Sequence, residues 1–368
     1  MSGKIGLVLS GGGAKGAYEI GVYKALSEIR ADYYIDSIAG TSVGALNAVL
    51  LESCGAEYSE QIWRNLKITD MLNPNINNLT KFIPAISSGN KPPQLSMDTM
   101  KNNNIFDDSI FDFQEAPFTL DDFLNDPFAD FTDPDYFYNN KNPFNSNKYS
   151  YPNQDYTYNK TQNVKQENTF NLINLFSNNG LFNLFKNQNI ITDFLKVCTP
   201  FDQKKIAQLI DRYVDFNRIY RKIFIACTCS TTQKLEYFFL NSYNHYLKKQ
   251  IVLASSALPF VYDEIEINGK KYADGGIPVI GDNTPVSCLY NNGCRSLIVV
   301  HLRYDANITN QYRMRDANIV NIIPSEHLGD LLDGTLNLNA TKVAHDIELG
   351  YRDTLKHMNE ICSMINNL

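Results

Sequence analysis

Ser42 stands in a sequence pattern that is typical of an activated nucleophile. It is the centre of Gly40-Thr41-Ser42-Val43-Gly44, which has the form G-x-S-x-G. An apolar, strand-like run precedes the pattern and a helix-like run follows it, which is the strand–turn–helix context of a nucleophile elbow. The two glycines leave room where a Cβ would collide with neighbouring backbone. We predict a hydroxyl that projects from the sheet edge at the start of a helix; a tight turn that serves only packing is the alternative.

A glycine-rich run forms the second candidate site. Gly11–Gly16, with the sequence GGGAKG, also lies between a strand-like and a helix-like segment. Its unhindered backbone N–H groups suit an oxyanion hole. The run lacks P-loop spacing, but Gly11, Gly13 and Gly16 fit G-x-G-x-x-G, and Asp36 follows at about the distance that a dinucleotide site requires. Such a site does not explain why a serine elbow occupies the next strand–helix turn.

The third candidate is an aspartate beside two glycines, Asp274-Gly275-Gly276. The glycines mark a tight backbone that can hold a carboxylate against a partner. A polar run, 282–285 with the sequence DNTP, follows shortly afterwards. The motif alone is a common turn, and it gains weight only beside the other two.

The elements that must position these residues alternate between strand and helix. Ile5–Leu9 and Tyr33–Ala39 have the apolar content of buried strands, and Ala14–Ile29 and Val43–Cys54 have helical spacing. This order predicts a three-layer α/β/α fold with a mainly parallel central sheet and a nucleophile elbow after its second strand.

Composition divides the chain into three zones. Residues 69–180 are rich in Asn, Asp and aromatic residues and lack sustained helical periodicity, which predicts a loop-like or partly disordered insertion. Residues 1–68 and 181–368 are expected to form one discontinuous domain. In the last zone we predict helices at 206–213 and 250–257, strands at 223–228, 235–240 and 296–302, and one long amphipathic helix at 328–358.

Charge and cysteine content exclude some classes of protein. The formal net charge is −7, and ten acidic residues between 107 and 135 account for more than all of it. An acidic chain argues against a nucleic-acid binder. The seven cysteines are irregularly spaced, which favours free thiols in a reducing compartment over a disulfide framework or a metal site.

Targeting signals are not apparent in the sequence. Ile5–Leu9 is too short for the core of a signal peptide, and no stretch approaches the roughly 18 apolar residues of a membrane span. We expect a cytoplasmic protein, either soluble or peripheral at a membrane. Secretion without a signal peptide remains an alternative.

The three motifs together resemble the patatin-like phospholipase family, which combines a G-G-G-x-[K/R]-G loop, a G-x-S-x-G elbow and a distant D-G-[G/A]. The stretch 254–259, with the sequence ASSALP, also looks like the family's segment just before the aspartate. Ser10 stands where many members carry Asp, and Lys15 where many carry Arg. The insertion has no counterpart in this resemblance. The matching motif positions are Gly11, Gly12, Gly13, Lys15, Gly16, Gly40, Ser42, Gly44, Asp274, Gly275 and Gly276.

The resemblance implies a serine–aspartate dyad. Ser42 would attack an ester carbonyl, Asp274 would accept its proton, and the N–H groups of Gly11–Gly13 would stabilise the oxyanion. It implies no metal ion and no other cofactor. A histidine-based triad stays open, because His301 and His327 follow Asp274 in the order found in α/β-hydrolases.

The function expected from this resemblance is hydrolysis of fatty acyl esters in phospholipids or other membrane lipids. Its substrate partner would be an acyl lipid at a membrane surface, and the aromatic-rich insertion is a hypothetical interfacial element. Two alternatives remain: a soluble esterase or thioesterase with the same dyad, and a catalytically idle scaffold whose insertion recruits protein partners.

Overall fold

A computed structural model of the chain describes residues 5–71, 73–74, 201–259, 261–277 and 280–368. Most of the predicted insertion therefore lies outside the described residues, and the division into domains stays a prediction. Two short elements at its start are described, α3 (Ile68–Met71) and β3 (Asn73–Pro74). β3 pairs antiparallel with β4 (Phe201–Asp202), so the chain leaves the described part and re-enters it at adjacent points.

The centre of the fold is an eight-stranded sheet. Its order is β10-β9-β1-β2-β5-β8-β7, and β6 pairs with β5. β10, β9, β1, β2 and β5 run parallel, whereas β6, β8 and β7 are added antiparallel. The predicted mainly parallel α/β sheet is confirmed. The strands are β1 (Ile5–Leu9), β2 (Ile35–Thr41), β5 (Lys222–Cys229), β6 (Lys234–Phe239), β7 (Ile265–Ile267), β8 (Lys270–Asp274), β9 (Ser296–Val300) and β10 (Asn318–Ile322).

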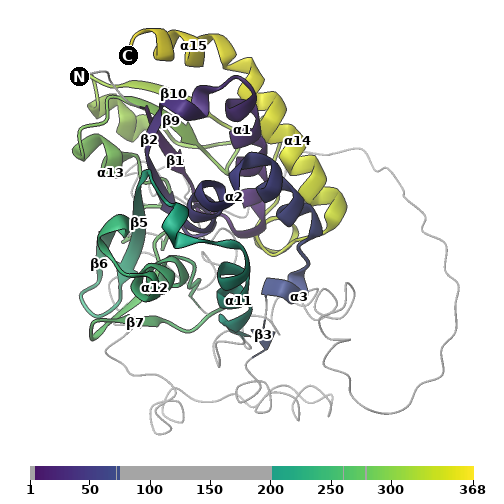
Figure 1. Ribbon diagram of the computed structural model, residues 1–368, viewed down its shortest axis with the longest axis vertical. Coiled ribbons are helices and arrows are strands. Elements are labelled where there is room, and N and C mark those ends of the chain that lie inside the picture. Colours follow the sequence, from purple (N-terminus) through teal and green to yellow (C-terminus); the bar gives the residue numbers. More distant parts are fainter. Residues whose placement is uncertain (1–4, 72, 75–200, 260, 278–279) are drawn as a thin grey trace, which may run out of the picture.

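Both faces of the parallel strands are covered, which explains why these strands read as continuous apolar runs. Leu7 and Leu9 of β1 pack into the larger core cluster, and Val8 packs into a smaller one on the opposite face. Figure 1 shows α1, α2 and α14 on one side of the sheet and α13 on the other. The helices are α1 (Ala17–Glu28), α2 (Val43–Asn65), α11 (Lys204–Tyr213), α12 (His245–Ser255), α13 (Val286–Asn291), α14 (Ala340–Lys356) and α15 (Met358–Asn366).

Short 3-10 helices connect several of these elements. They are η1 (Gly13–Gly16), η2 (Ala31–Tyr34), η3 (Phe216–Arg218), η4 (Leu240–Ser242) and η5 (Thr309–Arg313). The strands and helices predicted up to residue 302 are present, with ends that differ by a few residues. Six cysteines are described, and all six are free thiols.

Helix α2 reverses direction at Gly55, which has a φ of 73°. The second arm, residues 56–65, runs back along the first. The indole Nε1 of Trp63 therefore donates to Oδ1 of Asn47 at 2.9 Å, near the beginning of the same helix. The helix predicted at Val43–Cys54 corresponds to the first arm, and the second arm was not predicted.

The prediction of one long helix at 328–358 is wrong. A π-helical turn at Leu331–Thr335 comes first, and α14 begins only at Ala340, where the side chain of Asn339 accepts from the Thr341 N–H at 2.9 Å. Capping side chains of this kind satisfy the first free N–H groups and fix where a helix begins. The apolar periodicity continued across this boundary and hid it.

Candidate active site

The backbone of Ser42 lies in a strained turn between β2 and α2. Its φ of 54° and ψ of −121° are rare for a residue with a side chain. A Cβ at Gly40 would lie 2.5 Å from the Gly44 carbonyl oxygen, and one at Gly44 would lie 2.4 Å from that of Leu9. Only glycine fits at both positions, as the elbow pattern predicts.

Helix α12 ends at a serine that holds this turn. The Ser255 hydroxyl accepts from the Ser42 N–H at 2.9 Å and donates to the Ala226 carbonyl of β5 at 2.7 Å. Ser255 thus joins the elbow to the neighbouring strand across 213 residues of sequence. This serine lies in the family-like stretch 254–259, where the sequence alone indicates no role for it.

Asp274 is the last residue of β8, and its side chain is fully buried. Oδ1 accepts from the Gly276 N–H at 2.8 Å, whereas Oδ2 has no partner at hydrogen-bonding geometry. The main chain of Asp274 is also anchored, since its N–H donates to the Ala257 carbonyl at 2.9 Å.

Burial raises the pKa of Asp274 to about 7. An interaction with the Ser42 hydroxyl and the bond from the Gly276 N–H lower the pKa, but by less than burial raises it. The two side chains are therefore neighbours, although the contact is looser than an ordinary hydrogen bond. A carboxyl group with a pKa near 7 is suited to accept and return a proton at neutral pH.

The glycine-rich run lies directly against the elbow. A Cβ at Gly11 would be 3.2 Å from the Cβ of Ser42. The Gly11 N–H is already used, because it donates to the Asn283 carbonyl at 2.9 Å. Of the three predicted oxyanion donors, this leaves the N–H groups of Gly12 and Gly13. Lys15 is buried, and its N–H closes the turn onto the Gly12 carbonyl at 3.2 Å.

The DNTP run joins all three motifs. Thr41 Oγ1 donates to the Asp282 carbonyl at 2.7 Å, and the Asp282 N–H donates to the Gly275 carbonyl at 2.7 Å. One residue further on, Asn283 accepts from Gly11. The sequence shows this polar run beside the aspartate motif. Its hydrogen bonds to the other two motifs are tertiary contacts, which no local pattern reveals.

The histidines of the alternative triad lie elsewhere. His301 follows β9, and its Nε2 is 2.8 Å from Oδ1 of Asn321. Its burial lowers its pKa. His327 pairs with Asp330 at 3.2 Å. In the part of the chain that the structure describes, no hydrogen bond or ion pair joins either ring to Asp274.

Asp36, the acid of the dinucleotide alternative, lies at the beginning of β2 and pairs with Lys222 at 3.1 Å. The glycine run follows the opposite, carboxyl end of the parallel strands. Dinucleotide sites use an acid at that carboxyl end. The position of Asp36 therefore argues against this alternative.

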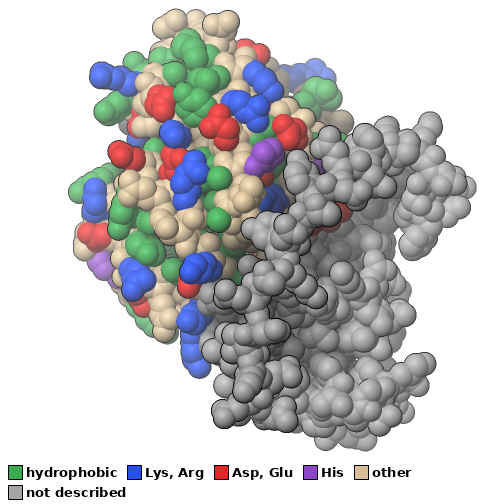
Figure 2. Space-filling model, turned by 90° about the vertical axis from the view of Figure 1, so that its right-hand side faces the viewer, with side chains coloured by type: hydrophobic (Ala, Val, Ile, Leu, Met, Phe, Trp, Pro, Cys, Tyr) green, Lys and Arg blue, Asp and Glu red, His purple; other side chains and the backbone are tan. Residues whose placement is uncertain are grey.

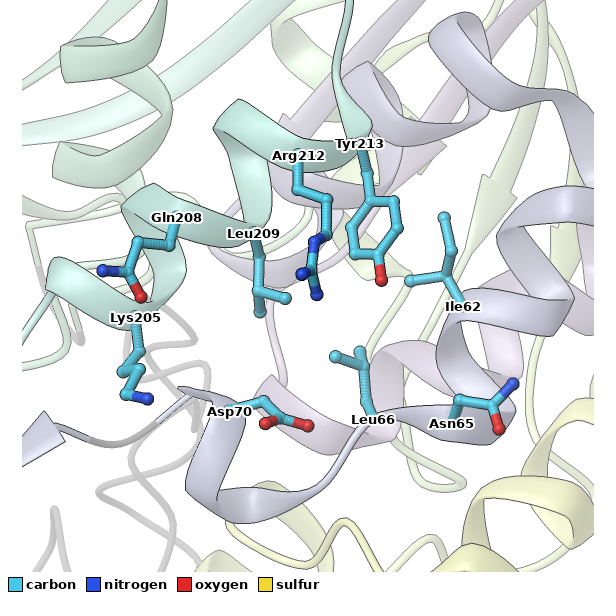
Figure 3. Close-up of a pocket in the computed structure, with 9 residues that line it drawn as sticks. All are labelled: Ile62, Asn65, Leu66, Asp70, Lys205, Gln208, Leu209, Arg212 and Tyr213. Carbon is cyan, nitrogen blue, oxygen red and sulfur yellow. The ribbon is translucent and has the colours of Figure 1, made fainter.

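A separate cavity of about 540 Å³ lies between the second arm of α2, α3 and α11. No predicted catalytic residue lines it (Figure 3). Within the described ranges, no group of three or more His, Cys, Asp and Glu side chains is arranged to hold a metal ion, and no helix is long and apolar enough to cross a membrane. The residues lining the cavity are Ile62, Asn65, Leu66, Asp70, Lys205, Gln208, Leu209, Arg212 and Tyr213.

The sheet and the strained serine turn define a three-layer α/β protein of the nucleophile-elbow class. A family comparison gives the class a narrower identity. The model of the patatin-like phospholipases matches residues 7–290, and the chain belongs to this family.

Individual relatives are more distant. Lysophospholipase nte1 of Aspergillus terreus is 56% identical over 46 residues, which are 12% of this chain and only 3% of that protein. Among solved structures, VipD from Legionella pneumophila has a TM-score of 0.45 at 16% identity and covers 99% of this chain and 67% of its own. The type III effector ExoU has a TM-score of 0.40 at 13% identity, covering 99% of this chain and 54% of its own.

Proposed function

We propose that this protein is a lipid acyl hydrolase in which Ser42 is the nucleophile and Asp274 is its base. The observation that carries the proposal is the fully buried Asp274 carboxyl group, whose pKa of about 7 is influenced by the Ser42 hydroxyl. Membership of the patatin-like phospholipase family supports an acyl lipid as the substrate class. No headgroup or acyl position is assigned.

The chemistry follows from the positions of these groups. The ionised Asp274 carboxylate takes the proton from Ser42 Oγ as this oxygen attacks the ester carbonyl carbon. The negative charge that develops on the carbonyl oxygen is stabilised by the N–H groups of Gly12 and Gly13. The C–O bond to the alcohol then breaks, and the leaving alkoxide receives the proton from Asp274. An acyl-Ser42 ester remains.

Water completes the reaction by the same route. Asp274 accepts a proton from water as the water oxygen attacks the acyl-Ser42 carbonyl, and it returns that proton to Ser42 Oγ when the fatty acid leaves. The strained backbone of Ser42 keeps Oγ in one position throughout. The hydrogen bond that the Ser42 N–H donates to the Ser255 hydroxyl supports this role, because it fixes the backbone of Ser42.

We also expect the protein to act at a membrane surface. Figure 2 shows one face of the described part, where Lys and Arg side chains are interspersed with Asp and Glu. Such a face offers no single-signed field to attract anionic lipid. This face of the described part is therefore not expected to prefer anionic over neutral lipid.

The test combines a covalent probe with a lipid substrate. Wild type, Ser42→Ala, Asp274→Asn and His301→Ala are incubated with a fluorophosphonate probe, and fatty-acid release from mixed phospholipid vesicles is followed with chelator present. We expect labelling at Ser42 and release by wild type and His301→Ala alone. A wild type that is neither labelled nor active would overturn the proposal in favour of an idle scaffold. Hydrolysis of soluble esters without hydrolysis of vesicle lipid would make the protein a soluble esterase.

A further inference from the structure

A buried polar cluster lies behind the glycine run and has no part in the chemistry proposed above. It consists of Glu19 on α1 and Asn47 and Trp63 on the two arms of α2. Glu19 is fully buried. Its Oε2 accepts from Asn47 Nδ2 at 2.8 Å, and its Oε1 has no partner at hydrogen-bonding geometry.

Asn47 uses all of its side-chain hydrogen-bonding groups within this region. Nδ2 donates to the Gly16 carbonyl at 2.9 Å as well as to Glu19, and Oδ1 accepts from Trp63 Nε1 at 2.9 Å. Every amide hydrogen therefore has one acceptor, which fixes the orientation of the side chain. The fully hydrogen-bonded Asn47 side chain therefore holds Gly16, Glu19 and Trp63 in one arrangement.

The cluster touches each segment that must be aligned for acyl transfer. Asn47 lies about one helical turn after Ser42, and Gly16 ends the glycine run. The backbone of Ser10, directly before Gly11, also interacts with the Glu19 carboxyl group. A single carboxyl group thus contacts the segment before the oxyanion donors and, through Asn47, both the segment after them and the first turn of the nucleophile's helix.

We propose that Glu19 is a positioning residue of the acyl-transfer site, where it holds the glycine run against the first turn of α2. This role rests on the function proposed above. Glu19 does not touch the reacting atoms. It acts through Asn47 and the Ser10 backbone, and Trp63 closes the cluster on the far side.

The cluster makes this alignment sensitive to pH. Burial raises the pKa of Glu19 to about 8, and the interactions with Asn47 and Ser10 lower it by less. The carboxyl group is therefore mainly neutral at pH 7. Above pH 8 an ionised carboxylate would be buried, which is costly without a paired cation. We expect the cluster to rearrange and the oxyanion donors to move.

Charged groups on the surrounding elements have partners of their own. On α14, Asp353 accepts from Tyr18 and Lys356, and Asp346 pairs with Lys342. On the second arm of α2, Glu60 pairs with Lys24 and Arg64. Lys15 is the buried cation of the glycine run itself, and it also has a partner. None of these groups is among the causes of the shifted pKa of Glu19.

The first test does not depend on enzymatic activity. It uses the fluorescence of Trp63, which is the single tryptophan of the chain. Its fluorescence is measured against pH in wild type, in Ser42→Ala, which cannot turn over, and in Glu19→Gln. Glu28→Gln is the matched control, since Glu28 is also on α1 but bonds Tyr351 at the surface. We expect a midpoint near pH 8 in all variants except Glu19→Gln. No midpoint in wild type, or one that persists in Glu19→Gln, overturns the proposal.

The second test measures ester hydrolysis against pH. Glu19→Gln keeps a neutral side chain, so we expect kcat at pH 7 within about threefold of wild type and no decline through pH 8. Glu19→Ala should lose on the order of ten- to a hundredfold in kcat with little change in KM, because the loop is misplaced while lipid binding remains. A folded Glu19→Ala with wild-type kcat and an unchanged alkaline decline overturns the proposal.

The two tests separate the two proposals. If wild type hydrolyses no ester, the proposed function fails, whereas the Trp63 titration still decides whether Glu19 controls the cluster. If Glu19→Ala does not fold, the isosteric Glu19→Gln variant carries both measurements.

Discussion

The parallel and antiparallel parts of the sheet contribute to the site in different ways. The parallel strands β1 and β2 supply the glycine run and Ser42 from the first 44 residues, each in a strand–turn–helix connection. The antiparallel strand β8 and the adjacent α12 supply Asp274 and Ser255 from more than 200 residues further along the chain. The proposed nucleophile is therefore placed by local structure, and the proposed base by long-range pairing.

This difference follows from sheet geometry. Neighbouring parallel strands end at the same edge, so the loops after β1 and β2 meet without further help. Asp274 reaches that edge because β8 pairs antiparallel with the final part of β5, where Asp274 lies opposite Cys227. Hydrogen bonds that Ser255 and the carbonyls of Asp282 and Asn283 accept then join the two parts of the site. Substitutions at these contacts should therefore disturb the site, although the sequence of the antiparallel part does not mark them as important.

The largest expected effect comes from removing the base. Asp274→Asn keeps the size of the side chain and the acceptor for Gly276, but it cannot take a proton. We expect kcat/KM for ester hydrolysis to fall by at least about a thousandfold while the fold is retained. Circular dichroism and fatty-acid release measure the two properties separately. Substantial activity in a folded Asp274→Asn protein would show that another group is the base.

Ser255→Ala tests the hydrogen bonds through which the end of α12 connects Ser42 to β5. The substitution leaves the Ser42 N–H and the Ala226 carbonyl without their shared partner. We expect a loss of about 1–3 kcal/mol in the free energy of unfolding, measured by denaturant titration. We also expect activity to fall on the order of ten- to a hundredfold through misplacement of Ser42.

Ser256→Ala is the matched control for Ser255. Among the described residues, the Ser256 hydroxyl donates only to the carbonyls of Val252 and Leu253 in the preceding helix. Its loss should change activity by less than about twofold, since surrounding contacts of the elbow are kept. Equal effects of the two substitutions would show that the hydrogen bonds of Ser255 have no special role.

The pH dependence sharpens the comparison, because activity and stability should move in opposite directions. Asp274 has a pKa raised from 3.8 to about 7 in the folded protein. Its neutral form is favoured by folding, so its contribution to stability is complete below pH 4 and is lost as pH rises through 7. Activity should rise over the same range, because the base must be ionised.

Two variants separate the groups that cause this behaviour. The slope of stability for one such group is about 1.4 kcal/mol per pH unit within its window. Glu19, raised from 4.5 to about 8, adds a second decline of the same sign. Asp274→Asn and Glu19→Gln should each flatten the slope of the unfolding free energy against pH. An unchanged slope in both variants would contradict the prediction that the two carboxyl groups are buried in their neutral form.

A small effect on catalysis is also expected for His301→Ala. The ring bonds Asn321 of β10, and its loss leaves a half-buried amide with one partner fewer. Stability should fall, whereas kcat should change by less than about threefold at neutral pH. A loss comparable with that of Ser42→Ala would restore the histidine triad.

The sequence by itself determined the parallel strands and the residues that carry the candidate chemistry. Local rules were sufficient there, because only glycine fits at positions 40 and 44 and because apolar runs mark strands buried on both faces. The same local rules failed at 328–358, where the cap at Asn339 interrupts a periodic pattern. They also failed at Gly55, where α2 turns back although apolar residues continue on both sides of the turn.

Only the tertiary structure decided which polar groups meet. Ser255, Asn283 and Glu19 are ordinary residues in the sequence, and they acquire their partners from segments that are distant along the chain. The tertiary structure also showed that the Gly11 N–H is already used, which leaves Gly12 and Gly13 as the proposed oxyanion donors. The physical reason is that a hydrogen bond and a shifted pKa depend on distance and burial, which spacing along the chain does not determine.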